Sequence, residues 1–276
     1  MKKILVPTDF SEQAENALKV AAQLARKHDS KIYLLHMLEL PLQEVDMMNA
    51  ASPIPEAMFF MKLAQQKFED LLARDYLNGL MVHDIVKNYP SFSSIIDTCH
   101  EYNVDLIVMG SHGATGLKEM FIGSNTEKVV RTSDIPVLVI KNEHANFKVD
   151  RFVFASDFNK DNRETYKQAT EVAKIFNAKM YLVMVNTANS FISTSEARKR
   201  INAFIKDSEF ENYSTHIYND DSVEQGILNF SKDIDADLIG ISTHGRQGIA
   251  HFFNGSISED LVNHSKRPVM TFKILT

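Results

Sequence analysis

The chain has 276 residues, a length that favours two domains over one or three. Hydrophobic residues make up 44% and charged residues 24%, and 10 Gly with 7 Pro leave no low-complexity stretch, so disordered and fibrous classes are excluded. The net charge of −6 disfavours nucleic acid as a partner, because nucleic-acid-binding domains present a basic face.

The first apolar run, residues 3–6, is followed so soon by Asp9 that the start of the chain does not read as a signal peptide. No later window approaches the roughly 18 consecutive apolar residues that a membrane span needs. We therefore expect a cytoplasmic protein with no membrane partner.

Five short runs rich in Ile, Leu and Val follow one another in the first half, as is typical of strands covered on both faces. They occupy residues 3–6, 32–38, 81–86, 106–109 and 137–140. Between them, apolar residues recur at helical spacing after Ser11, and again after Ser91 or Ser93, where serine suits a helix N-cap. The alternation predicts parallel strands joined by helical crossovers. Cys99 falls on the apolar side of the second of these helices and is predicted to be a buried small hydrophobe.

The stretch from Pro41 to about Tyr76 interrupts this pattern and is predicted to be a variable surface connection. Its apolar residues recur at helical spacing, which favours a helix that starts near Pro55 and covers the core. The residues assigned to this face are Met58, Phe59, Met61, Leu63 and Phe68. The alternative is a partner-binding surface rich in Met and Phe.

The second half repeats the first. Residues 3–11 align with 151–159, and residues 105–113 align with 237–245. Strands are predicted at 152–155, 180–185, 214–218, 238–241 and 269–273. The boundary falls between Asn142 and Val149, which gives domains of residues 1–143 and 149–276. The fold class is α/β: two tandem doubly wound, Rossmann-like domains, each with a five-stranded parallel sheet and helices on both faces.

Glycines gather after the fourth strand, where a doubly wound sheet binds ligands. Gly110 and Gly113 are followed by Gly123 and Ser124, which open the next helix. Glycines let backbone N–H groups approach an anion closely, and a helix N-terminus favours phosphate. The other interpretation is that the glycines turn the chain and Ser124 is an ordinary N-cap.

The spacing G-x2-G-x9-G-S, behind a chain that starts with Pro7-Thr8-Asp9, resembles the universal stress protein family over both halves. In that family this pattern marks the ATP-binding subgroup, so the resemblance implies an adenine nucleotide: ATP, ADP or AMP. It implies that the glycine loop and serine hold phosphates, that the aspartate contacts the nucleoside, and that adenine lies by the second strand. The implied residues are Pro7, Thr8, Asp9, Met37, Gly110, Gly113, Gly123 and Ser124.

The second half departs from this pattern at Ser242, which replaces the first glycine. A serine there costs stability if the backbone needs a positive φ. The other equivalents are Asp157, Gly245, Gly255 and Ser256, with Arg246 as an added phosphate contact or an exposed loop residue. Nucleotide binding in this half therefore stays open.

Other chemistry has less support. Neither the Walker loop nor the dinucleotide fingerprint occurs, and no Cys and His cluster has metal-ligand spacing. The expected metal is therefore only Mg²⁺ or Mn²⁺ carried by the nucleotide. His112 and His244 either orient their loops or contact phosphate. We expect a regulatory binding protein in stress response and not an enzyme; a slow ATPase or phosphoryl or nucleotidyl transferase, and a scaffold or small-molecule binding protein, are the alternatives.

The last strand of each half would leave a sheet edge open. Members of the family pair through this strand, so the resemblance implies an intramolecular pseudo-dimer here, with further homodimerisation as an option.

Overall fold

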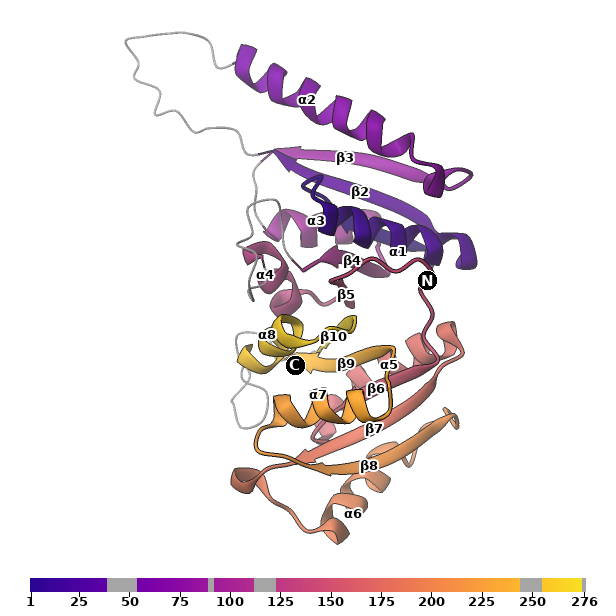
Figure 1. Ribbon diagram of the computed structural model, residues 1–276, viewed down its shortest axis with the longest axis vertical. Coiled ribbons are helices and arrows are strands. Elements are labelled where there is room, and N and C mark those ends of the chain that lie inside the picture. The colour runs from indigo at the N-terminus through magenta and orange to yellow at the C-terminus, as the bar shows by residue number, and fades with distance from the viewer. Residues whose placement is uncertain (39–53, 89–91, 112–122, 244–254, 275–276) are drawn as a thin grey trace, which may run out of the picture.

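A computed structural model describes residues 1–38, 54–88, 92–111, 123–243 and 255–274 (Figure 1). Strands and helices alternate in both halves, as the sequence predicts. The first half contains β1 (Lys3–Pro7), α1 (Glu12–His28), β2 (Lys31–Leu38), α2 (Ile54–Leu72), a 3₁₀ turn (Asp75–Leu77), β3 (Val82–Asn88), α3 (Phe92–Tyr102), β4 (Leu106–Gly110), α4 (Ser124–Thr132) and β5 (Val137–Ile140).

The second half repeats this order of strands and helices, and its two 3₁₀ turns precede its first and second helices. It contains β6 (Arg151–Ala155), a turn (Lys160–Asn162), α5 (Arg163–Phe176), β7 (Lys179–Asn186), a turn (Ala188–Ser190), α6 (Thr194–Ile205), β8 (Tyr213–Asn219), α7 (Val223–Asp233), β9 (Leu238–Thr243), α8 (Gly255–His264) and β10 (Val269–Lys273). All ten predicted strands are present, each with ends within two residues of the prediction.

The ten strands form one sheet in the order β3-β2-β1-β4-β5-β10-β9-β6-β7-β8. Strand neighbours within each half run parallel, whereas β5 and β10 run antiparallel and join the halves. Leu138 of β5 lies opposite Met270 of β10 in the register. The predicted pairing of the two final strands within the chain is confirmed, and it gives the chain the form of a pseudo-dimer.

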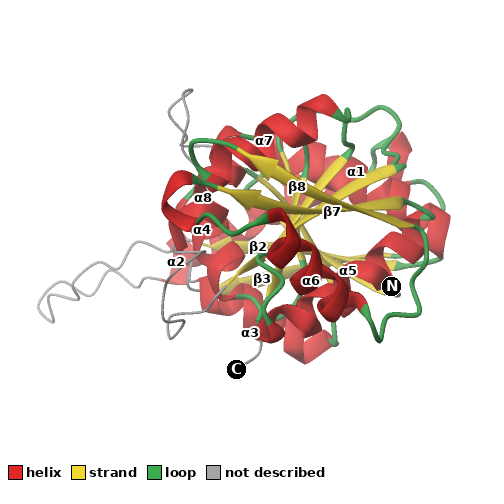
Figure 2. Ribbon diagram, turned by 90° about the horizontal axis from the view of Figure 1, so that it is seen from below, coloured by secondary structure: helices red, strands yellow, loops and turns green. Residues whose placement is uncertain are grey.

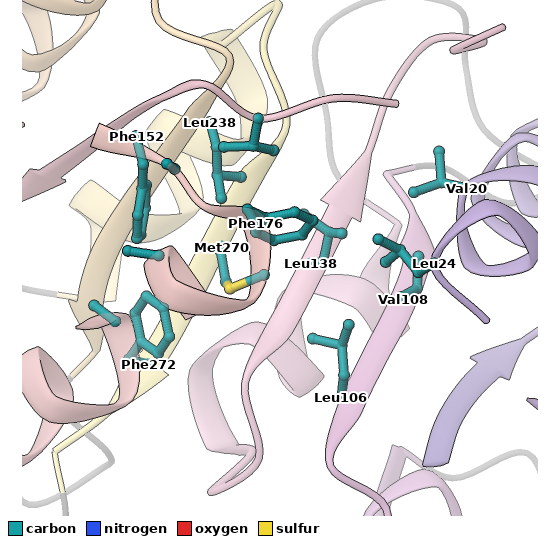
Figure 3. Close-up of a cluster of buried hydrophobic side chains, with 14 of the residues drawn as sticks. Val20, Leu24, Leu106, Val108, Leu138, Phe152, Phe176, Leu238, Met270 and Phe272 are labelled. Carbon is teal, nitrogen blue, oxygen red and sulfur yellow. The ribbon is translucent and has the colours of Figure 1, made fainter. Parts of the chain in front are cut away.

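Helices cover both faces of the sheet (Figure 2). On one face, α1, α2, α5 and α6 bury a cluster that continues across the β5–β10 pair (Figure 3). On the other face, α3, α4, α7 and α8 bury a second cluster. Cys99 lies in this second cluster with no exposed surface, and burial raises the pKa of its thiol to about 12. The prediction that Cys99 is a buried small hydrophobe is confirmed.

Two predictions about helix starts have different outcomes. Ser11 caps α1, because its Oγ accepts a hydrogen bond from the backbone N–H of Ala14 at 3.2 Å. Ser93 lies inside α3 and is not its cap, and Ser91 falls outside the described residues.

The predicted helix near Pro55 is present as α2, but its assigned inner face is wrong. Phe68 is buried, together with Ala64 and Leu71. The four other residues assigned to the core are exposed, namely Met58, Phe59, Met61 and Leu63. The assignment failed because Phe59 and Leu63 lie on the side of the helix away from Phe68, whereas Ala64, Phe68 and Leu71 follow the i, i+4, i+7 spacing of a single face.

Candidate nucleotide site

The loops after β1 and β6 have the same hydrogen-bonding pattern. Thr8 Oγ1 accepts from the N–H of Phe10 at 3.0 Å, and Ser156 Oγ accepts from that of Phe158 at the same distance. One residue later, Asp9 Oδ1 and Asp157 Oδ1 each accept at 3.0 Å from a backbone N–H two positions on. These bonds order each loop at the carboxyl end of its own strand, β1 in the first parallel set and β6 in the second, and α/β sheets bind ligands at such ends.

Both loops contain a phenylalanine in the left-handed backbone region. The φ angle is 64° at Phe10 and 55° at Phe158. This conformation costs a bulky residue free energy and persists only where packing holds the ring, and such strain is concentrated at functional sites. Phe158 is buried and packs edge-on against Phe204 of α6, with ring centres 5.2 Å apart.

In the first half the strained ring rests on a histidine. Phe10 lies 4.5 Å from the ring of His36 and 5.1 Å from that of Phe68. His36 Nδ1 donates to the carbonyl oxygen of Thr8 at 2.8 Å, and burial lowers the pKa of the imidazole. Thr8 N donates to Leu35 O at 2.8 Å and Pro7 pairs with Leu35, so both lie at the end of β2 as the resemblance implies. Met37 is half-buried, two residues further along β2.

In the second half the same position holds a cavity of about 300 Å³. The carboxyl ends of β6 and β7 form one wall, with Ser156 and Asp157 at the loop. Val223 and Ile227 of α7, Arg200 of α6 and the exposed Phe191 complete it. Its volume lies at the lower end of the range of small-molecule sites.

Asparagine side chains hold Asp157 in this cavity. Asn159 Nδ2 donates to Asp157 Oδ2 and Asn162 Nδ2 donates to Asp157 Oδ1, both at 2.6 Å. In the aligned first half these asparagines are Ser11 and Ala14. The carboxylate of Asp157 is thereby fixed at the edge of the cavity, ready to accept hydrogen bonds from ligand hydroxyl groups.

The condition under which Ser242 would cost stability, a positive φ at this position, is not met. Gly110 has no positive φ; instead, a Cβ there would lie 2.8 Å from the backbone of Gln13 in α1. Ser242 fits at the equivalent place with no exposed surface, and its Oγ lies 2.7 Å from Thr165 Oγ1 of α5. The side chain of Ser242 has room because α5 begins only after a 3₁₀ turn. In the first half, α1 begins directly after its Ser11 cap, at an earlier aligned position than α5 does.

The start of α4 matches an anion-binding helix N-terminus. Gly123 is the N-cap and has no side chain to cap the helix, and Ser124 is exposed in the first turn. Gly123 N donates to Ser111 O at 2.8 Å, and Thr126 Oγ1 donates to Gly110 O at 3.0 Å. These bonds connect α4 to the end of β4. The interpretation of Ser124 as an ordinary N-cap is therefore wrong.

Several predicted residues lie outside the described part of the chain or of its side chains. Gly113, His112, Gly245, Arg246 and His244 fall in the first group. Gly255 and Ser256 open α8, and only their backbone is described. Among the described residues, no three His, Cys, Asp or Glu side chains gather where they could hold a metal ion.

Comparison with known proteins identifies the family to which the chain belongs. The profile of the Universal stress protein family matches residues 1–141 and again residues 148–273. The chain belongs to the universal stress protein family. This tandem universal stress protein is 32% identical over 157 residues to a universal stress protein of Methanocaldococcus jannaschii, covering 52% of the chain and 97% of that protein.

Similarity also extends over both halves together. A Synechocystis universal stress protein is 23% identical over 297 residues, which cover 99% of this chain and all of that protein. The crystal structure of a universal stress protein from Archaeoglobus fulgidus has a TM-score of 0.71 at 23% identity, with 99% and 98% of the two chains covered. In the described part of this universal stress protein, every helix is too short or too polar to cross a bilayer.

Sequence reasoning missed Asn159, Asn162 and Arg200. Both asparagines follow Asp157 closely, and Asn side chains often bond to nearby loop groups, so a local signal was present. Arg200 belongs to the cluster Arg198-Lys199-Arg200, whose composition suggests only a solvated helix face. Its place in the cavity wall depends on how α6 packs, and no local pattern records that.

Proposed function

We propose that this universal stress protein binds an adenine nucleotide in each half, within domains of residues 1–143 and 149–276. The observation that carries the proposal is the cavity of about 300 Å³ at the ends of β6 and β7, beside the ordered Ser156-Asp157 loop. A nucleoside needs apolar walls for its base and an acceptor for its ribose hydroxyls. Val185 and Ile227 supply the walls, and Asp157 supplies the acceptor.

In the first half, the same loop geometry at Thr8 and Asp9 supports the corresponding site. The uncapped start of α4 at Gly123 and Ser124 supports a phosphate position. Gly110 contributes by letting α1 approach the end of β4. Phosphates in this place would bring any Mg²⁺ or Mn²⁺ with them, so the protein needs no metal site of its own.

The proposed role is regulatory binding without turnover. Among the described residues, the carboxylates at the two loops are engaged by loop donors: Asp9 by Ser11 N, and Asp157 by Asn159 and Asn162. We assign these carboxylates to holding the loops and, at Asp157, to accepting ligand hydroxyl groups, and not to taking a proton from the attacking water as a general base would. Nucleotide occupancy can then regulate the protein only by favouring one of two states.

The test is to denature freshly purified protein and quantify released adenine nucleotide per chain by chromatography. We expect about two per chain after incubation with ATP. Val223→Trp fills the second cavity and should remove one, and Gly113→Val should remove the other. Asp29→Asn is the control, because asparagine tolerates the left-handed C-cap of α1.

A chain that binds no added ATP in a folded state contradicts the proposal. Two nucleotides retained in Val223→Trp would contradict the second-half site. ATP hydrolysis well above background that is lost in Asp9→Asn with binding intact would place the protein among enzymes.

A further inference from the structure

Two equivalent grooves lie on the face of the sheet that α1 and α5 cover, one beside each helix. The antiparallel pair β5–β10 lies between them. Residues 141–150, which connect the halves, pack beside α1 in the first of these, here called the filled groove. The second, called the open groove, is a cavity of about 290 Å³ beside α5. The repeat alignment places Gln23 of the filled groove at Glu171 of the open groove.

In the filled groove, the surface beside α1 binds a segment of the chain itself. Gln23 Nε2 donates to His144 O at 2.7 Å, and Phe147 N donates to Gln23 Oε1 at 2.6 Å. The side chain of Phe147 packs against the core and lies 6.0 Å from Phe176, ring centre to ring centre. A single glutamine thus holds the backbone of a peptide segment, and an aromatic side chain anchors it.

The open groove is the equivalent surface beside α5, with Glu171 in place of Gln23 and with no occupant from the described residues. Its walls are apolar, and both halves contribute: Leu106, Pro136, Val172, Ile175, Phe176 and Met270 (Figure 3 shows Leu106, Phe176 and Met270). Asp105 starts β4 by accepting from Lys2 N and Lys3 N, as Asp237 does for Asp150 N and Arg151 N beside the filled groove. The two grooves are therefore built on equivalent strand starts.

A buried polar atom in the open groove lacks a partner. Gln168 lines this cavity, and its Oε1 is buried and accepts no hydrogen bond within the described part of the chain. A buried acceptor without a donor costs free energy, which a ligand N–H would recover once the amide of Gln168 turns from its buried position toward the groove. Asp105 and Glu171 also line the cavity and add negative charge at its edge.

We propose that the open groove binds an extended peptide segment that carries an aromatic anchor followed by a basic residue. The anchor occupies the apolar walls, a backbone N–H of the segment donates to Gln168 Oε1, and the basic side chain faces Asp105 and Glu171. The connecting segment itself has this pattern in Phe147-Lys148. This site is separate from the nucleotide cavities and does not depend on them.

The test uses a fluorescent synthetic peptide with the sequence of residues 142–150 and the intact protein. Fluorescence anisotropy measures its Kd. Val172→Trp fills the open groove and should weaken binding at least about tenfold, and Gln168→Leu should weaken it by several-fold. A peptide with alanine in place of the phenylalanine should also bind at least about tenfold more weakly.

The matched control is Gln23→Leu, which alters the filled groove and should leave the Kd of the peptide unchanged. A Kd that changes with Gln23→Leu but not with Val172→Trp means that the peptide displaces the connecting segment, and it overturns the proposal. So does a protein that binds the apolar dye anilinonaphthalene sulfonate in a Val172-dependent way but not the peptide, because the groove would then take small molecules. Circular dichroism and unchanged nucleotide content establish that each variant is folded.

Discussion

The loops after β1 and β6 have the same backbone geometry but rest on different supports. Phe10 packs on His36 of β2 and on Phe68 of the long helix α2, whereas Phe158 packs on Phe204 of the shorter α6. In the second half, asparagines fix the aspartate and α5 starts after a 3₁₀ turn. Both halves thus keep the strained loop after the first strand, whereas the residues that pack around this loop differ between them.

Removing the ring of the strained phenylalanine should have the largest effect on stability. We expect Phe158→Ala to lower the free energy of unfolding by about 3 kcal/mol, because the ring is buried, with part of the loss offset by relief of backbone strain. Phe10→Ala should cost less, about 2 kcal/mol, since its ring is only half-buried. Urea denaturation monitored by circular dichroism measures both. Equal losses would show that the two supports contribute alike.

Exchanging the residues at the end of β4 and β9 tests the explanation for Ser242. Gly110→Ser should cost about 2 kcal/mol, because its Cβ would lie 2.8 Å from the backbone of Gln13 and α1 would have to shift. Ser242→Gly should cost about 1 kcal/mol, mainly by removing the hydrogen bond with Thr165. The same urea titration applies. If Gly110→Ser is as stable as the parent, the close approach of α1 does not determine the residue at position 110.

The histidine beneath the first loop predicts the smallest and most specific difference. Burial lowers the pKa of His36, so the folded state binds its proton less readily than the unfolded state does. Stability should therefore fall as the pH drops below about 6.5 towards the lowered pKa of the folded state. His36→Met copies Met184 of the second half and should remove this part of the pH dependence.

The measurement is the difference in unfolding free energy between the two proteins from pH 7.5 to pH 5. Because His28, His144 and His216 also have lowered pKa values, only this difference isolates His36. A difference that does not change with pH would contradict the assigned burial effect.

The sequence was sufficient to predict the fold because its signals are local and repeated. Each strand is a short apolar run, and the pairs Thr8-Asp9 and Ser156-Asp157 occupy equivalent ends of β1 and β6. The family profile then confirms the tandem arrangement. Local patterns with a repeat were enough to predict the strands and the parallel α/β class, whereas the pairing of β5 with β10 came from the family resemblance.

The misses share a physical cause: each depends on packing between distant elements. The sequence offered a positive φ as the condition under which Ser242 would be costly, but what limits position 110 is the backbone of Gln13 in α1. Met61 shares a helical face with Phe68, seven residues away, yet it is exposed, so contact with the sheet decides how far along α2 that face is buried. The cavity wall at Arg200 depends on α6 in the same way.

The antiparallel pair β5–β10 has a consequence for how such a chain can diversify. In a dimer of identical subunits, every substitution near the two-fold axis appears twice, once on each side. Here Val137 faces Thr271 and Leu138 faces Met270, so each side of the seam is encoded separately. In a single chain, a residue on one side of the seam can change without changing its counterpart on the other side. The connecting segment therefore packs beside α1, whereas the equivalent surface beside α5 keeps an open cavity.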